Sequence, residues 1–315
     1  MTPGPERPGP KAHERELGFH SGFVTIVGRP NVGKSTLVNQ LVGSKVAITS
    51  SRPQTTRTTI RGVRTTTSTQ MVLLDTPGLH KPRTALGERT NETARATLDE
   101  VDVICFVLDA TKSIGSGDRF VADLVRAAST PTVLVVNKVD AVSKPDVLGH
   151  LAGAASDLGE GFDAYVPCSA RTGEGVDALA QELESRLPEG PQYYPDGIVS
   201  DQPELFVAAE LVREQLLRAT RDEVPHSIVV TVEELEDDER NHPDDVWRLR
   251  AIVRVERDSQ KGIVIGKGGA VLKSAASAAR RELEALLGTR VYLETTVRVE
   301  RDWQRRPQLL DRLGF

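Results

Sequence analysis

The stretch Gly28-Arg29-Pro30-Asn31-Val32-Gly33-Lys34-Ser35 has the pattern G-x-x-x-x-G-K-S, which is typical of a phosphate-binding loop. The apolar run 23–27 before it predicts a buried strand, and residues 36–42 after it predict a helix. Glycines let backbone N–H groups turn toward phosphate oxygens, and the start of the helix adds the positive end of its dipole. We therefore expect Lys34 to bridge the β- and γ-phosphates of a nucleotide and the Ser35 hydroxyl to ligate Mg²⁺. The expected nucleotide contacts of this stretch are Gly28, Arg29, Pro30, Asn31, Val32, Gly33, Lys34, Ser35 and Thr36.

The composition is that of a globular protein. Of the 315 residues 38% are hydrophobic and 27% are charged, and the length predicts about two domains. No apolar run reaches the roughly 18–20 residues that span a bilayer. Residues 1–20 hold four prolines among charges and no apolar segment, so we expect a disordered tail and not a secretory signal. Cys105 and Cys168 lie in apolar runs without metal-ligand spacing, which predicts reduced core thiols in a cytosolic protein.

The net charge of −5 is unevenly distributed. Residues 247–315 hold 15 Lys and Arg against 8 Asp and Glu, and the rest of the chain holds 25 against 37. A basic C-terminal part behind an acidic N-terminal part indicates that only the C-terminal part meets a polyanion.

A second motif, D-x-x-G, runs from Asp75 to Gly78 at the end of an expected strand. The Asp of such a motif reaches magnesium through water, and the Gly N–H meets the γ-phosphate. The polar loop 45–57 should supply a second hydroxyl to the magnesium ion, from Thr55 or Thr56, of which we prefer Thr56.

The third motif, N-K-x-D, consists of Asn137, Lys138 and Asp140 and predicts a guanine site. The Asp140 carboxylate would accept from guanine N1–H and the 2-amino group, which adenine lacks, so adenine would leave it buried without partners. Asn137 would contact guanine N7 and steady the phosphate loop, and the Lys138 stem would lie over the base. After the next strand, at Ser169, the Ala170 N–H can donate to guanine O6.

These motifs all follow expected strands, and open α/β sheets bind ligands at that edge. The sequence therefore predicts an α/β fold, with a Ras-like P-loop G domain over residues 21–188. Its expected strands are 58–64, 71–75, 101–109, 132–137 and 164–169, and its expected helices are 117–128, 146–158 and 176–187.

The expected reaction is slow, magnesium-dependent GTP hydrolysis, with Lys34, Thr56 and Gly78 as catalytic residues. Leu79 stands where Ras-like proteins have a Gln that orients the attacking water, so the alternative is a protein that only binds GTP. Related GTPases with an Asn in the phosphate loop use it to ligate K⁺; Asn31 either does this or only stabilises the loop.

A linker over 189–202 precedes a second, smaller α+β domain over 203–300, and a tail follows over 301–315. The expected order is helix 203–218, strands 227–233 and 247–256, a G-x-x-G turn, helix 270–287 and strand 290–300, which is the order of a type II KH domain. In KH domains this turn clamps the backbone of about four nucleotides of single-stranded RNA. We expect Ile263 and Ile265 to line either the base-binding groove or the domain core, of which we prefer the core. The predicted RNA-binding residues are Lys261, Gly266, Lys267, Gly268, Gly269 and Lys273.

The chain resembles the Era family of bacterial GTPases, in the TrmE-Era-EngA-EngB-Septin group, from about residue 22 to residue 315. The resemblance is carried by residues 28–35, 54–57, 75–80, 137–140, 206–217, 223–225 and 265–270. It implies a cytoplasmic GTPase, working with GTP, GDP and Mg²⁺, that binds small-subunit (16S) rRNA near its 3′ end and acts in rRNA processing and 30S subunit biogenesis. It also implies peripheral association with the inner face of the cell membrane. We expect a monomer.

The expected mechanism is a switch, in which GTP and Mg²⁺ order the loops 45–57 and 76–89 and these loops contact the KH domain or its linker. Three alternatives are an RNA-binding adaptor with a vestigial nucleotide site, a metabolic P-loop kinase, and a tandem-domain or tRNA-modifying GTPase relative. The intact motifs argue against the first, and N-K-x-D argues against the second. The third is disfavoured by the single P-loop and by the lack of a catalytic Cys motif at the end of the chain.

Overall fold

The computed structural model describes residues 18–50, 52, 55–79, 82, 84–220, 224–235 and 246–315. Some expectations lie outside the described residues: nearly all of the tail 1–20, Gln54 and His80 of the family motifs, Glu223, and most of the acidic loop 234–245. In the described part of the chain, no helix is both long enough and apolar enough to cross a bilayer.

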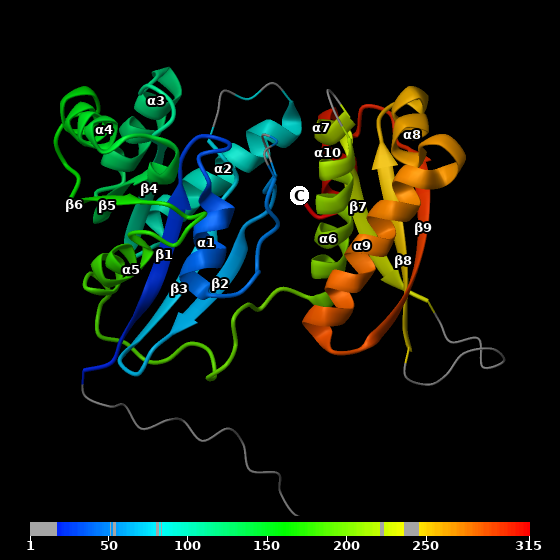
Figure 1. Cartoon of the computed structure of the whole chain (residues 1–315), viewed down its shortest axis with the longest axis horizontal. Helices are drawn as coiled ribbons and strands as arrows, with labels where there is room; N and C mark the ends of the chain where they lie inside the picture. Colours follow the sequence, from blue (N-terminus) through cyan, green and yellow to red (C-terminus); the bar gives the residue numbers. More distant parts are fainter. Residues whose placement is uncertain are drawn as a thin grey trace, which may run out of the picture.

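The N-terminal domain is built on a six-stranded sheet of order β2-β3-β1-β4-β5-β6, in which only β2 runs antiparallel to its neighbour (Figure 1). Its strands are β1 His20–Val27, β2 Ile60–Thr65, β3 Thr69–Asp75, β4 Val103–Asp109, β5 Thr132–Asn137 and β6 Ala164–Cys168. Its helices are α1 Lys34–Val42, α2 Ala85–Asp99, α3 Ser116–Ala127, α4 Lys144–Asp157 and α5 Val176–Glu184, with a short 3₁₀ turn at Val139–Ala141.

The side chains of strand β4 explain why helices cover both faces of the sheet. Val103, Cys105 and Val107 belong to the core under α1 and α5, whereas Ile104 and Phe106 belong to the core under α2, α3 and α4. Alternating side chains point to opposite faces, so an uninterrupted apolar run requires a helical layer on each face. Cys105 and Cys168 are both free and buried, and burial raises the pKa of each thiol.

The segment between the domains runs along the N-terminal domain before it enters α6. The Tyr193 ring packs on Phe23 with centroids 5.2 Å apart, and Gln70 Oε1 accepts from the backbone N–H groups of Tyr193 and Tyr194. Further along, the Val199 carbonyl accepts from Val63 N at 2.8 Å. The edge strand β2 is therefore covered by this segment.

The C-terminal domain is a three-stranded sheet of order β7-β8-β9, with β8 antiparallel to β7 and parallel to β9. Helices α6 and α9 lie side by side on one face (Figure 1), and they enclose its core with α8. The elements are α6 Glu204–Ala219, α7 Val224–Ser227, β7 Val229–Glu234, β8 Val246–Val255, α8 Asp258–Ile265, the 3₁₀ turn Lys267–Gly269, α9 Ala270–Leu287 and β9 Arg290–Val299.

The last segment is folded between the two domains. It consists of the 3₁₀ turn Trp303–Arg305 and helix α10 Pro307–Leu313. Trp303 and Leu310 are fully buried in a small core that they share with Leu86 of α2 and Val229 of β7. Trp303 is thus a packing residue of the interface between the domains.

Two expectations about local structure are wrong. Helix α2 begins at Ala85, inside the stretch 76–89 that was expected to be a loop, because Thr84 caps its N-terminus by accepting from Gly87 N. Ile263 is 51% exposed and not in the core, whereas Ile265 packs partly buried against it. The helix α8 turns Val264 inward at this point, and its neighbour Ile263 therefore points outward.

Candidate functional site

The loop 28–35 connects β1 to α1 at the carboxyl edge of the sheet, and its backbone is tightly enclosed. Gly33 has a φ of 102°, and a Cβ there would lie 2.3 Å from Asn137 Nδ2. A Cβ on Gly28 would lie 2.5 Å from the Val107 carbonyl oxygen. Only glycine fits at these two positions, so the pattern G-x-x-x-x-G reflects close approach as well as backbone freedom.

The Lys34 side chain lies within the loop and is 7% exposed. Its Nζ donates to the carbonyls of Gly28 at 3.2 Å and Arg29 at 3.0 Å. Burial lowers the pKa of Lys34 to about 8, and nearby Asp75 acts in the opposite direction. A buried ammonium group beside a glycine-rich loop at the start of a helix is suited to bind anionic oxygens.

Three oxygen-bearing side chains from separate segments converge beside Lys34. The Ser35 and Thr56 hydroxyls donate to the same oxygen of Asp75, Oδ2, at 2.7 and 2.9 Å, and they lie 2.9 Å from each other. The hydroxyl of Thr55 instead donates to the Arg52 carbonyl at 2.8 Å. The geometry therefore selects Thr56 over Thr55 as the partner of Ser35 and Asp75.

This cluster suits a magnesium ion. Asp75 is fully buried, its Oδ1 has no hydrogen-bond partner, and burial raises the pKa of its carboxyl despite the hydrogen bond from Ser35. A bound divalent cation would satisfy that oxygen and keep the carboxylate ionised. Gly78, at the end of the D-x-x-G motif, touches the loop itself, because a Cβ there would lie 2.8 Å from Pro30 N.

Asn137 holds three motifs together. Its Nδ2 donates to the Val32 carbonyl at 2.8 Å, and its Oδ1 accepts from Ala170 N at 2.9 Å. The side chain thus steadies the phosphate loop, as expected. The Ala170 N–H, which we expected to face guanine O6, is engaged with Asn137 in this structure.

The two other residues of N-K-x-D also have defined partners. Lys138 Nζ donates to the Asn31 carbonyl at 2.6 Å and to Asp109 Oδ2 at 2.7 Å. Asp140 accepts from the Ser169 hydroxyl at 2.5 Å and pairs with Arg171, and the Ser169 bond is the main cause of the lowered pKa of its carboxyl. An ionised Asp140 is the acceptor that guanine recognition needs.

Sequence reasoning missed Asp109 and Arg171. Asp109 ends β4 and could have been found from its place at the carboxyl edge of the sheet. Arg171 directly follows Ser169 and Ala170, so its nearness to the base site could have been inferred from the motif.

The G-x-x-G turn lies between α8 and α9. Gly266, Gly268 and Gly269 all have positive φ, at 74°, 59° and 78°, and Lys267 and Gly268 are exposed. Beside the turn is a groove of about 260 Å³, whose lining includes Gly269, Leu272, Lys273, Arg280 and Leu293. Lys261 is half-buried on α8. The structure thus gathers the predicted RNA-binding residues around one turn and the start of α9.

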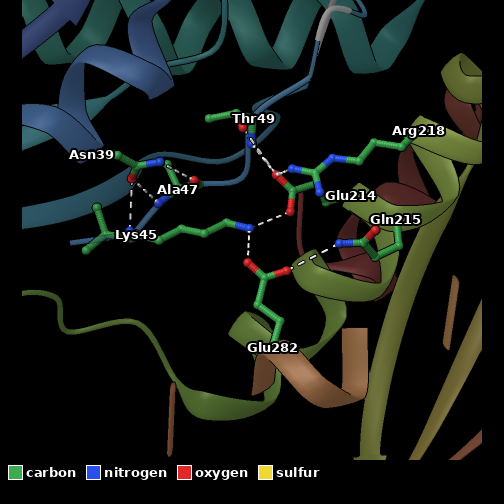
Figure 2. A network of polar contacts seen from close by, with 9 residues as sticks. Asn39, Lys45, Ala47, Thr49, Glu214, Gln215, Arg218 and Glu282 are labelled. Carbon is green, nitrogen blue, oxygen red and sulfur yellow. Dashed lines mark hydrogen bonds and ion pairs between the residues drawn. The ribbon is translucent and has the colours of Figure 1, made fainter. Parts of the chain in front are cut away.

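The loop 45–57 touches the C-terminal domain through a buried carboxylate (Figure 2). Glu214 of α6 is fully buried, accepts from Thr49 N at 2.8 Å and pairs with Lys45 at 2.5 Å and with Arg218 at 3.0 Å. Lys45 also pairs with Glu282 of α9. This network, which sequence reasoning did not find, ties the phosphate site to the two helices of the second domain.

Both domains match known families. Residues 23–138 match the family model described as 50S ribosome-binding GTPase, and residues 223–304 match the KH domain. The GTPase Era of Mycobacterium tuberculosis strain H37Rv is 52% identical over 300 residues, which cover 94% of this chain and 99% of that protein. The GTPase Era of Mycolicibacterium smegmatis is 51% identical over 299 residues, with the same coverage.

Two solved structures are similar over the whole fold. One is a crystal structure of Era in complex with MgGDPNP and nucleotides 1506–1542 of 16S ribosomal RNA, and the other is a variant of Aquifex aeolicus Era bound to GDP and AlF4⁻. Each has a TM-score of 0.88 and 37% identity and covers 94% of this chain and 99% of that chain.

Fold and site together define a P-loop GTPase whose G domain is followed by a KH domain. Since the identity to curated relatives exceeds one half over nearly the full length of both proteins, the chain belongs to the GTPase Era family.

Proposed function

We propose that this GTPase binds GTP with Mg²⁺, hydrolyses it slowly, and binds small-subunit rRNA near its 3′ end in the course of rRNA processing and 30S subunit biogenesis. The observation that carries the proposal is the convergence of Ser35, Thr56 and Asp75 beside Lys34, in a chain whose relative was crystallised with MgGDPNP and a 16S rRNA fragment. The roles of individual residues are part of the proposal.

In the nucleotide site, Ser35 and Thr56 ligate Mg²⁺ and Asp75 holds it through water. Lys34 and the Gly78 N–H stabilise the charge on the γ-phosphate, and Asp140 and Asn137 bind the guanine. The residues 28–36 surround the phosphates, and Ser169 orients the Asp140 carboxylate.

Hydrolysis is slow because no side chain at position 79 can orient water. Leu79 is 1% exposed and belongs to the core under α2. We propose that K⁺, held by the Asn31 side chain, supplies part of the missing charge stabilisation. Turnover should then be faster in K⁺ than in Na⁺, and Asn31→Ala should abolish that difference; equal rates in both cations would exclude the proposal.

The RNA site is the turn Gly266–Gly269 with Lys261, Lys267 and Lys273 around it. Glycines permit close approach of the RNA backbone, and the start of α9 adds N–H groups that face phosphate. The charge of the C-terminal part, 15 Lys and Arg against 8 Asp and Glu over residues 247–315, favours a polyanionic partner.

Exchange of GTP for GDP changes the loop 45–57, and this loop contacts α6 and α9 of the RNA-binding domain. Nucleotide and RNA affinities should therefore be coupled, by the same factor in both directions. A cytoplasmic location, a monomeric state and peripheral membrane association stay predictions, and the membrane association is implied by the family resemblance alone.

The nucleotide part of the proposal is tested by measuring guanine selectivity in the variant Asp140→Asn. The amide would present a donor where guanine needs an acceptor, so GTP affinity should fall roughly 10³-fold or more, and xanthosine triphosphate, with a carbonyl at that position, should bind instead. Asp157→Asn, an exposed position of α4 whose partner is Arg119, serves as the control. Equal competition by ATP and GTP for the unaltered protein would refute the nucleotide part of the proposal.

The RNA part is tested by titrating a 16S rRNA 3′ fragment into protein loaded with GDP or with a GTP analogue. Lys267→Glu should weaken RNA binding without changing GTP affinity, because Lys267 is exposed and lies in the other domain. If the RNA affinity changed neither with the substitution nor with the bound nucleotide, the proposed switch would be contradicted.

A further inference from the structure

The segment Thr55–Arg57, which presents the Thr56 hydroxyl, is held by the C-terminal domain on both sides of Thr56. On one side, the Arg57 guanidinium donates to the carbonyls of Ile228 at 2.6 Å and His226 at 2.8 Å. Its carbon Cζ lies 5.4 Å from the ring centroid of Trp303. Arg57 is 7% exposed, so the residue after Thr56 is anchored inside the other domain.

On the other side, Arg213 of α6 donates from Nη2 to the Thr55 carbonyl. Its guanidinium is oriented by Glu210, one turn earlier on the same helix, through bonds of 2.7 Å from Nε and 2.6 Å from Nη2. Arg213 is 2% exposed. A planar guanidinium fixed by a carboxylate on two donors has little freedom left, so its contact with Thr55 is geometrically defined.

The Thr55 carbonyl belongs to the same rigid peptide plane as the Thr56 N–H. A bond to that carbonyl therefore restrains the peptide unit before Thr56, and the anchored side chain of Arg57 restrains the residue after it. Glu214, the next residue on α6, fixes the start of the same loop at Thr49 (Figure 2). Helix α6 thus contacts the loop at Thr49 and at Thr55. With the loop held in this way, the Thr56 hydroxyl points toward Ser35 and Asp75.

We propose that Arg213 is a positioning residue for GTP hydrolysis, supplied by the RNA-binding domain and acting through Thr56. The inference rests on the proposed role of Thr56 as a magnesium ligand. In this role Arg213 acts through the peptide that places the ligand. Groups that orient a metal ligand commonly affect metal affinity or activity by about 10–100-fold.

The test compares Arg213→Gln with the paired change Glu210→Gln/Arg213→Gln, which leaves no unpaired buried charge if the single variant folds poorly. Arg126→Gln on α3 removes an exposed i,i+3 pair with Asp123 that contacts neither the described residues of the loop 45–57 nor the Arg213 pair, and serves as the surface control. For each protein one measures kcat, the Mg²⁺ concentration for half-maximal turnover, and the affinities for GDP and for a GTP analogue.

In both Arg213 variants, kcat should fall about tenfold or more and the half-maximal Mg²⁺ concentration should rise about tenfold. Affinity for the GTP analogue should fall while GDP affinity stays unchanged, because the Thr56 ligand is engaged only with the γ-phosphate present. Arg213→Lys, which keeps one donor, should recover part of the loss. Arg126→Gln should behave as the unaltered protein.

If the variants lost affinity for GDP and for the GTP analogue equally, Arg213 would have a merely structural role and the inference would be overturned. Variants with unaltered kcat and unaltered Mg²⁺ dependence would overturn it as well. Thr56→Ala separates this from the parent proposal. If Thr56→Ala impairs turnover and the Arg213 variants do not, only the inference fails; if the unaltered protein shows no Mg²⁺-dependent GTP hydrolysis, the proposed function fails.

Discussion

Lys34 illustrates how a single residue combines a folding cost with a binding role. Its ammonium group is buried among backbone carbonyls, and burial lowers its pKa to about 8 from the ordinary lysine value of 10.5. The unfolded chain therefore binds more protons than the folded chain between these two values, so the Lys34 contribution to stability improves as pH rises through that window. Binding follows the opposite trend, because phosphate oxygens need the protonated form.

The first prediction is a pH dependence of nucleotide affinity. GTP affinity should fall between about pH 7 and about pH 9 by up to tenfold per pH unit above the Lys34 pKa, with proton uptake on binding. Calorimetry in buffers of different ionisation enthalpy measures both quantities. Lys34→Arg keeps the charge over this range and should bind more weakly but with a flat profile. A flat profile for the unaltered protein would contradict the assigned role of Lys34.

At the residue scale, most of the nucleotide site was predictable, because its residues lie in short contiguous motifs. The sequence identifies Ser35, Asp75 and Asn137 without any knowledge of tertiary contacts, and the structure brings them into one place. The sequence does not identify Arg213 or Glu214, because a helical Arg or Glu is usually solvated. Nothing nearby in the sequence indicates that these two side chains contact a loop about 160 residues earlier.

At the scale of elements, the G-x-x-G turn contains glycines that are required for different reasons. Gly266 combines a φ of 74° with a site where a Cβ would lie 2.5 Å from Val271 Cγ2, on the first turn of α9. Gly268 has a φ of 59°, but nothing lies within 4 Å of its Cβ position. The first glycine thus permits packing of α9 on α8, and the second keeps the exposed surface of the turn small.

The second prediction follows from this difference. Gly266→Ala should lower the free energy of unfolding of the C-terminal domain by roughly 2–4 kcal/mol, from backbone strain plus overpacking, whereas Gly268→Ala should cost only roughly 1–2 kcal/mol. Urea unfolding followed by far-UV circular dichroism measures both. Gly268→Ala should still weaken RNA binding, because its methyl group lies on the exposed surface. Equal destabilisation by the two substitutions would refute this account of the turn.

Element types and order were largely predictable from periodicity, and α9 begins and ends where its pattern indicated. Helix α2 was missed because its sequence, with Thr90, Asn91 and Thr93, has weak helical propensity and few apolar residues. Its contacts with the C-terminal segment, including Leu86 with Trp303 and Leu310, provide tertiary packing that the local sequence does not show.

At the scale of the whole molecule, Trp303 is one of the residues that join the two domains. Its ring stacks on Phe315 at 5.7 Å, its Nε1 donates to the Ser227 carbonyl at 2.9 Å, and Arg57 of the N-terminal domain lies over it. On α2, Arg89 donates to Asp311 at 2.6 Å and to the Phe315 carbonyl at 2.8 Å. The C-terminal segment thus packs against the N-terminal domain, an arrangement that charge and composition did not indicate.

The third prediction concerns this interface. Trp303→Ala should lower the free energy of unfolding by roughly 3–5 kcal/mol and separate the unfolding of the two domains into distinct transitions. A GTP analogue should then raise the unfolding temperature of the first domain only, which differential scanning calorimetry measures. Trp247→Ala, at a partly buried site on β8 within the second domain, is the control and should lower stability without uncoupling the domains. A single cooperative transition in Trp303→Ala would contradict the prediction.

The covered edge of β2 has a geometric consequence for the motion between domains. Because the stretch up to Asp201 is bonded to the first sheet through Gln70, Val63 and Arg61, a hinge within the linker would lie beyond it, at Pro203 directly before α6. Arg213 lies ten residues beyond Pro203, which is about 15 Å along the helix at 1.5 Å per residue. A rotation of about 10° at that point, about an axis perpendicular to the helix, would displace the helix at Arg213 by roughly 2.6 Å, enough to break its bond to Thr55. A small angular change at one proline is thus converted into the gain or loss of a contact beside the magnesium ligand.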